Sequence, residues 1–266
     1  MGKQKLRIVH NMARSGSTLM CKCLGCMEGV ALLSEQHPKA WNLFNPLTQA
    51  EAWFQLITPS EFADMKKKGV ITFIEAITLI EERCRARGLT LVLRDWAHLD
   101  YTGLPFVATP GYRPLLYTTL SESFDIIRIS TTRDPVTQWQ SLVKLPMMHK
   151  SIQSGALGPG QFLVGYRKYA ELCVETGFIR YEDFVRNPEM AMRKMCEQLE
   201  IKFDPEFANK WYGYKKISGD VIIQRNSNEI KMPPSRPIEP DLRREFLASA
   251  DYHRACELLG YEPLAK

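Results

Sequence analysis

The sequence has no apolar run that approaches the roughly 20 residues of a membrane-crossing helix, so we expect no transmembrane segment. The apolar stretch behind its basic start is too short for a secretory signal peptide and is interrupted by Arg7 and His10. An N-myristoylation signal is also missing, because Leu6 stands where that signal requires Ser or Thr. We therefore expect a cytoplasmic protein.

The sequence also lacks a disulfide pattern and a strong excess of one charge. Its seven cysteines are an odd number, which favours reduced thiols. Cys21, Cys23 and Cys26 cluster, but no second Cys or His cluster completes a zinc site, so we predict buried thiols and no bound metal. The net charge of +5 suits a small anionic ligand and is too weak to indicate nucleic acid.

The composition is that of an ordinary globular protein. Of the 266 residues, 45% are apolar and 24% are charged, which argues against disorder, collagen and coiled coil. Because no internal repeat and no low-complexity linker divides the chain, we expect a single domain over residues 1–266. Residues 212–240 are rich in Lys, Arg, Gly and Pro and have little periodicity, which predicts a long loop or lid.

Segments with the pattern of strands alternate with segments that have the spacing of helices. Strands are predicted at Lys5–Met12, Val30–Ser34, Thr90–Leu93, Phe124–Thr131 and Phe178–Tyr181. Helices are predicted at Gly16–Met27, Ile71–Arg87, Pro135–Leu145, Phe162–Thr176, Pro188–Leu199 and Asp241–Leu259. This alternation predicts a three-layer α/β fold, with a mostly parallel β-sheet flanked by helices.

The first candidate site is the turn between the opening strand and its helix. It reads His10-Asn11-Met12-Ala13-Arg14-Ser15-Gly16-Ser17-Thr18. Backbone N–H groups and the positive end of the helix dipole converge at such a turn, which suits a phosphate. The turn predicts a P-loop-like nucleotide-binding fold, but Ser17 stands where a nucleoside triphosphatase has Lys, and the cation is Arg14 instead.

Two further features follow along the chain. Arg133 ends a predicted strand, and Ser141 lies two turns inside the next helix, so a forked cation and a hydroxyl are available for a terminal phosphate. The segment Ile179-Arg180-Tyr181-Glu182-Asp183-Phe184 precedes another helix start. Taken alone, each feature is also explained by an ordinary capped helix or turn.

Together and in this order, the three features resemble the sulfotransferases that use 3′-phosphoadenosine-5′-phosphosulfate (PAPS). The resemblance relates Arg14-Ser15-Gly16-Ser17-Thr18 to the loop for the donor's 5′-phosphosulfate, with Arg14 also catalytic, and Arg133 and Ser141 to the pair for its 3′-phosphate. It relates Tyr181-Glu182-Asp183 to the family's segment near the adenine. It implies transfer of a sulfuryl group from PAPS to a hydroxyl or amine of a small-molecule, lipid or glycan acceptor, without a metal. The product would be adenosine 3′,5′-bisphosphate.

The sequence departs from the family's pattern in several places. Leu19 stands where the cytosolic branch has an aromatic residue against adenine, so the adenine contact must differ. Glu35, His37 and His98 are all candidates for the general base. The family's C-terminal Arg-Lys-Gly contact is missing, and its candidate replacements are Lys215, Lys216 and Arg225, around Ser218-Gly219-Asp220.

Two other functions fit parts of the sequence. Thr90–Asp95 resembles the strand of a P-loop small-molecule kinase that ends in a magnesium-binding Asp, although Ser17 and the pair Arg133 and Ser141 speak against it. A non-catalytic nucleotide-binding module would keep the same loop without turnover. The aromatic residues between Trp41 and Phe62, with Trp96, Tyr101 and Phe106, either line an acceptor pocket or pack in the core.

Overall fold

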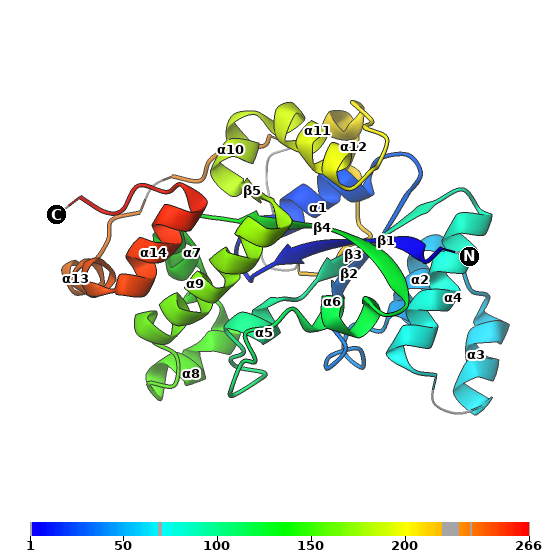
Figure 1. Cartoon of the computed structure of the whole chain (residues 1–266), viewed down its shortest axis with the longest axis horizontal. Helices are drawn as coiled ribbons and strands as arrows, with labels where there is room; N and C mark the ends of the chain where they lie inside the picture. Colours follow the sequence, from blue (N-terminus) through cyan, green and yellow to red (C-terminus); the bar gives the residue numbers. More distant parts are fainter. Residues whose placement is uncertain (1, 69–70, 220–228, 235, 266) are drawn as a thin grey trace.

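A computed structural model of the chain describes residues 2–68, 71–219, 229–234 and 236–265 (Figure 1). Its sheet has five strands in the order β2-β3-β1-β4-β5, and every neighbouring pair is parallel. The strands are β1 Gln4–Asn11, β2 Val30–Gln36, β3 Thr90–Asp95, β4 Phe124–Thr132 and β5 Phe178–Arg180. The predicted α/β fold is therefore confirmed, and the sheet is wholly parallel rather than mostly so.

Helices cover both faces of the sheet. They are α1 Ser17–Gly25, α2 Pro46–Phe54, α3 Pro59–Lys68, α4 Phe73–Ala86, α5 His98–Tyr101, α6 Leu115–Leu120, α7 Pro135–Leu142, α8 His149–Gln153, α9 Pro159–Thr176, α10 Tyr181–Arg186, α11 Pro188–Gln198, α12 Phe207–Lys210, α13 Pro240–Ala248 and α14 Ala250–Leu259, with 3-10 turns at Pro146–Met148 and Trp211–Gly213.

Alternation along the strands divides the core between the two faces. Val9, Leu32 and Val92 pack with α1 and α11 on one face. Their neighbours, such as Ile8 and Leu33, pack with α2, α4 and α6 on the other face. Near β4 this second face is covered by α9, which packs in turn against α14. These three layers place the carboxyl ends of the strands at one edge, where ligands of such sheets bind.

Local signals positioned most of the predicted helices. The predicted helix after Asp134 is confirmed at its start, because the Asp134 carboxylate accepts the Thr137 N–H at 2.8 Å, but it ends at Leu142 instead of Leu145. The single helix predicted over Asp241–Leu259 is wrong. Ser249 adopts an extended conformation there and caps a second helix by accepting the Tyr252 N–H at 3.3 Å.

Most of the aromatic residues that follow β2 pack in the core. Trp41, Phe54 and Phe62 lie against the apolar cluster that α2 and α4 form with the sheet. Tyr101, which is 2% exposed, packs edge-on against Tyr169. Trp96 forms a separate cluster with Phe44 and Phe106, at ring distances of 5.2 and 4.9 Å. Packing against other apolar side chains therefore accounts for all of these aromatic residues.

Candidate functional site

The predicted phosphate turn lies between β1 and α1, at the carboxyl edge of the sheet. Arg14 has a φ of 67° and Gly16 a φ of 83°, so two residues take left-handed backbone conformations within three positions. The first turn of α1, Ser17–Met20, carries no charged side chain. The first backbone N–H groups of a helix have no acceptor within that helix, so they are available to a ligand. This is the geometry that favours an anion at a helix N-terminus.

The residues of the second motif meet this turn. Nε of Arg14 donates to Oγ of Ser141 at 2.9 Å, although the two residues are 127 positions apart. Nη1 of Arg133 donates to the backbone carbonyl of Arg14 at 3.4 Å. Arg14, Arg133 and Ser141 therefore form one cationic cluster. The Arg14 guanidinium lies on the side that the resemblance relates to the 3′-phosphate.

The third motif also closes on the turn. Tyr181, which is 5% exposed, begins α10, and its ring lies so close to Gly16 that an added Cβ would stand 2.1 Å from Cδ2. The Arg133 guanidinium lies 5.0 Å from the centre of the same ring. Gly16 is therefore required twice, by its positive φ and by this contact. The three motifs lie together around one point.

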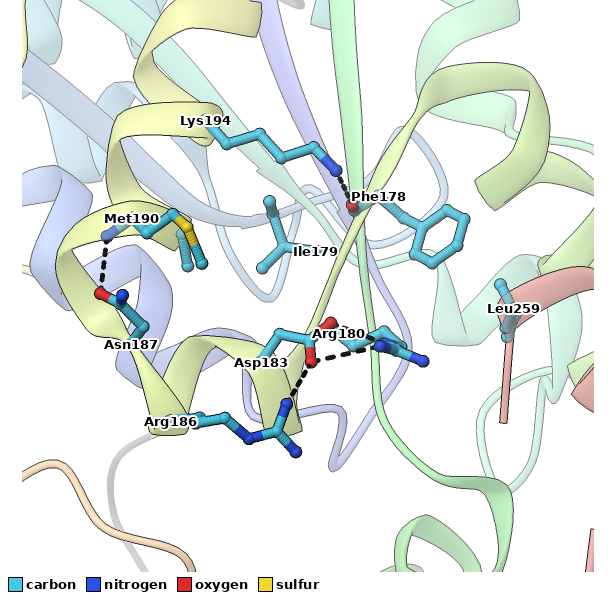
Figure 2. A pocket seen from close by; sticks show the side chains of 10 residues that line it. Phe178, Ile179, Arg180, Asp183, Arg186, Asn187, Met190, Lys194 and Leu259 are labelled. Carbon is cyan, nitrogen blue, oxygen red and sulfur yellow. Dashed lines mark hydrogen bonds and ion pairs between the residues drawn. The ribbon is translucent and has the colours of Figure 1, made fainter. Parts of the chain in front are cut away.

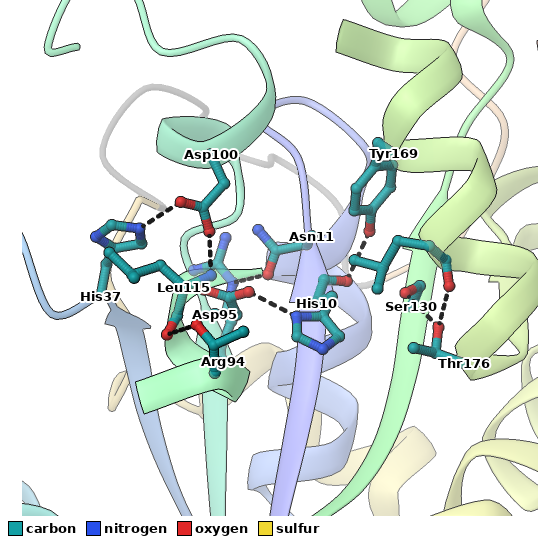
Figure 3. Close-up of polar contacts among 12 residues, drawn as sticks. His10, Asn11, His37, Arg94, Asp95, Asp100, Leu115, Ser130, Tyr169 and Thr176 are labelled. Atoms are coloured by element: carbon teal, nitrogen blue, oxygen red, sulfur yellow. Dashed lines mark hydrogen bonds and ion pairs between the residues drawn. The ribbon is translucent and has the colours of Figure 1, made fainter. Parts of the chain in front are cut away.

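Arg94, at the end of β3, is a site residue that the motifs missed. It is 4% exposed, and Nη2 donates to Oγ of Ser17 at 3.2 Å and to Oγ1 of Thr18 at 3.0 Å. Its Nε donates to Oδ1 of Asn11 at 3.2 Å (Figure 3). The sequence carried one signal for it, because Arg94 stands at a predicted strand end, and such ends gather at one edge of a parallel sheet.

A buried carboxyl–imidazole pair lies beside Arg94. Oδ2 of Asp95 is 2.6 Å from Nδ1 of His10, and both side chains are fully buried (Figure 3). Burial raises the pKa of Asp95 well above its usual value and lowers the pKa of His10 to about 3. Asp95 therefore shares a proton with His10 inside the protein instead of presenting an open carboxylate to the turn.

The three candidate bases have different surroundings. Glu35, the last residue but one of β2, has a φ of 54°, and its partly exposed carboxylate lies 4.0 Å from Nη1 of Arg94. His37 is buried with both ring nitrogens engaged, Nε2 with Asp100 at 3.1 Å and Nδ1 as acceptor of the Lys39 N–H at 3.2 Å. His98 donates from Nε2 to the Leu104 carbonyl at 2.8 Å.

Burial lowers the pKa of His98 to about 4. Nδ1 of His98 is buried and has no hydrogen-bond partner among the described residues. A neutral ring that donates from Nε2 keeps a lone pair on Nδ1. His98 is therefore a neutral, enclosed histidine at the start of α5, whereas the Glu35 side chain is 13% exposed and lies beside Arg94.

The candidate replacements for the C-terminal Arg-Lys-Gly contact that the structure describes do not lie together at the turn. Nζ of Lys215 lies 6.0 Å from the Tyr212 ring, and Nζ of Lys216 lies 4.7 Å from the Phe54 ring. These contacts direct both ammonium groups to aromatic faces outside the turn. Arg225 lies outside the described residues. The part of this segment that does reach the turn is Ser218, whose carbonyl accepts from Nη1 of Arg94 at 3.1 Å.

A cavity of about 410 Å³ lies elsewhere, beside β5 and α11 (Figure 2). Its Asp183 carboxylate accepts from both Arg180 and Arg186, at 2.7 and 3.1 Å. Its Lys194 donates to the Phe178 carbonyl at 3.2 Å. The Asp183 carboxylate thus offsets the charge of both arginines, which makes this cavity a less favourable place for an anion.

The clustered cysteines lie on or just after α1, and Cys21 and Cys23 are buried. Burial raises the pKa of Cys21 to about 11, so it is an unreactive thiol. Over the described ranges, no group of three or more His, Cys, Asp or Glu is placed to hold a metal ion. Within the same part of the chain, no helix is both long and apolar enough to cross a membrane.

No protein-family model and no curated protein sequence matches the chain. Two solved structures resemble it over nearly their whole lengths. The sulfotransferase domain from the curacin biosynthetic pathway is 16% identical with a TM-score of 0.69, and the alignment covers 98% of this chain and 99% of that one. The sulfotransferase domain of the olefin synthase of Synechococcus PCC 7002 is 16% identical with a TM-score of 0.64, covering 98% and 96%. The chain therefore has the α/β fold of the sulfotransferases.

Proposed function

We propose that this protein is an enzyme that transfers a sulfuryl group from PAPS to a hydroxyl or amine of a small-molecule, lipid or glycan acceptor. One observation carries the proposal. Arg14, Arg133, Ser141 and Tyr181 come from three separate motifs, and they meet at the turn that contains Gly16. The sulfotransferase fold supports it.

Sulfuryl transfer is accelerated by positive charges and N–H donors that are already in position. In-line transfer of a sulfuryl group leaves negative charge on the bridging oxygen of the departing bisphosphate, and fixed donors near that oxygen lower the barrier. The amides of the turn with Ser17 and Thr18 would hold the 5′-phosphosulfate. Arg133 and Ser141, with Arg14 beside them, would hold the 3′-phosphate. This group carries about two negative charges, which the two arginines would offset.

We propose Glu35 as the base that takes the acceptor proton. It is the candidate with a partly exposed carboxylate beside the turn. Both ring nitrogens of His37 have hydrogen-bond partners, and His98 is enclosed, with 1% of its surface exposed. A base must reach the proton it removes, and a partly exposed carboxylate near the end of β2 meets that condition better than an enclosed ring.

The kinase alternative depends on Asp95 as a magnesium ligand. The carboxyl group of Asp95 is fully buried and bonded to His10, and its raised pKa favours the protonated form. Magnesium prefers ionised, accessible oxygen ligands. The surroundings of Asp95 therefore favour sulfuryl transfer over phosphoryl transfer.

A thermal-shift measurement tests the proposal. Adenosine 3′,5′-bisphosphate without magnesium should raise the unfolding midpoint, and ATP with magnesium should do little, because a ligand stabilises only the state that binds it. Arg133→Ala should abolish the shift. Arg186→Ala is the matched control, since Arg186 pairs with Asp183 on the far cavity. A larger shift with ATP and magnesium would support the kinase instead.

A non-catalytic module would bind the bisphosphate equally well, so a second measurement separates it from an enzyme. Release of the bisphosphate from PAPS in the presence of a panel of alcohols and amines reports turnover directly. We expect release that depends on one class of acceptor. Tight binding without release from any acceptor would favour the module.

A further inference from the structure

The hydrogen bonds of Arg94 are complete within the protein itself. An arginine side chain has five N–H donors and no acceptor. The acceptors are Asn11 Oδ1 on Nε at 3.2 Å, Ser34 Oγ and the Ser218 carbonyl on Nη1 at 2.9 and 3.1 Å, and Ser17 Oγ and Thr18 Oγ1 on Nη2 at 3.2 and 3.0 Å. Five donors thus meet five acceptors, and Arg94 keeps no N–H for a bound anion in this arrangement.

These bonds determine what the hydroxyls of Ser17 and Thr18 can do. A hydroxyl has one O–H donor and two lone pairs, and Arg94 occupies a lone pair of each. The two O–H hydrogens are therefore directed away from the guanidinium. A hydroxyl that accepts from a cation is also polarised, which strengthens the bond that it donates. Both hydroxyls are prepared as donors at the helix N-terminus.

Arg94 also connects the turn to the rest of the site. Oγ of Ser34, which accepts from Arg94, lies 2.8 Å from Oγ of Ser218 and accepts the Ser218 N–H at 3.2 Å. A Cβ on the following residue, Gly219, would stand 2.9 Å from Oε1 of Glu35. The guanidinium thus holds the turn, β2 and residues 217–219 in one arrangement.

We propose that Arg94 is a positioning residue, which touches no part of the donor and orients the Ser17 and Thr18 hydroxyls so that they donate to the oxygens of the 5′-phosphosulfate. The proposal rests on the proposed function for the identity of the donor. The anion at the turn can be tested separately, because pyrophosphate presents similar oxygens without an adenosine.

The test is a double-mutant cycle, with the affinities of pyrophosphate and adenosine 3′,5′-bisphosphate measured by titration calorimetry. The variants are Arg94→Gln, Ser17→Ala with Thr18→Val, and all three changes combined. Arg94→Gln should weaken both ligands about tenfold, the size of one lost charge-assisted hydrogen bond, and the loss of both hydroxyls should weaken them at least tenfold. The combined variant should lose no more than the variant without the two hydroxyls, because Arg94 acts through those hydroxyls.

Arg94→Lys provides a second variant in case Arg94→Gln does not fold, since it keeps the charge but cannot bond both hydroxyls and Ser34 together. The control is Arg128→Lys. Arg128 is a partly buried arginine on β4 that donates to Glu175 at 2.7 Å and lies 3.7 Å from the Tyr117 ring. It should leave both affinities unchanged.

The outcomes are distinct. Additive losses, at least a hundredfold in the combined variant, would overturn the proposal in favour of direct contact between Arg94 and the anion, or of general loosening. Unchanged affinity in folded Arg94 variants would overturn it too, as would a wild-type protein that binds neither ligand. If the wild type binds pyrophosphate but not the bisphosphate, and the pyrophosphate cycle is non-additive, the PAPS proposal fails and the role of Arg94 stands.

Discussion

Replacing Gly16 by alanine should damage both stability and donor binding, and Gly88 offers a matched comparison. Both glycines have positive φ, 83° and 68°. A Cβ at Gly88 would have nothing within 4 Å among the described residues, whereas a Cβ at Gly16 would stand 2.1 Å from Cδ2 of Tyr181. Gly88→Ala therefore reports the left-handed backbone alone, and Gly16→Ala adds a clash with a buried ring.

The two costs can be separated. Alanine in the left-handed region costs about 1–2 kcal/mol, and the gain from a stiffer unfolded chain is the same in both variants. Forcing a buried ring aside adds about 1–3 kcal/mol. We expect Gly88→Ala to lose about 1–2 kcal/mol and Gly16→Ala about 2–5 kcal/mol of unfolding free energy, measured by urea denaturation.

Ligand binding sharpens the comparison. Gly88→Ala should bind adenosine 3′,5′-bisphosphate as the wild type does, and Gly16→Ala should bind it at least tenfold more weakly, because Tyr181 and the turn must shift. Gly16→Ala should cost less stability in a Tyr181→Ala background than in the wild type, because the ring that it would displace is already gone. If Gly16→Ala matches Gly88→Ala in both stability and affinity, the close contact of Gly16 with Tyr181 is not part of the site.

Three further predictions concern single side chains. Arg133→Ala should weaken bisphosphate binding, whereas Arg14→Ala should also lower turnover, because it lies beside both motifs; equal losses of affinity with unchanged turnover would contradict these roles. Glu35→Gln should lower release of the bisphosphate by about 10²–10⁴-fold and leave its thermal shift intact, and retained release would exclude Glu35 as the base. The unfolded chain protonates His98 near pH 6.5 and the folded chain only at about 4, so stability should fall as pH drops through this window. His98 should contribute about 1.4 kcal/mol of unfolding free energy per pH unit. His98→Gln should therefore reduce the difference in unfolding free energy between pH 7 and pH 5, measured by urea denaturation.

Short-range signals explain why much of the fold was predictable. Asp134 caps α7, Asn187 accepts the Met190 N–H at 3.1 Å at the start of α11, and Gly88, with positive φ, follows α4. Each of these contacts joins residues within three positions or uses one backbone angle. The helix α10 was missed because its residues were assigned to a strand end and a motif.

The amino-acid sequence by itself determined the five strands, the helices after Gly16, Asp134 and Asn187, the turn at Gly16 and the motifs around Arg133 and Tyr181, because propensities, caps and turn chemistry act over a few residues. Only the tertiary structure decided that Arg94 bonds Ser17 and Thr18, that Tyr181 lies against Gly16, and that Glu35 stays partly exposed while His98 is enclosed. These contacts depend on strand register, such as Val9 opposite Arg94, and on which side chains become buried. Both are properties of segments far apart in the chain, which meet only when the sheet assembles.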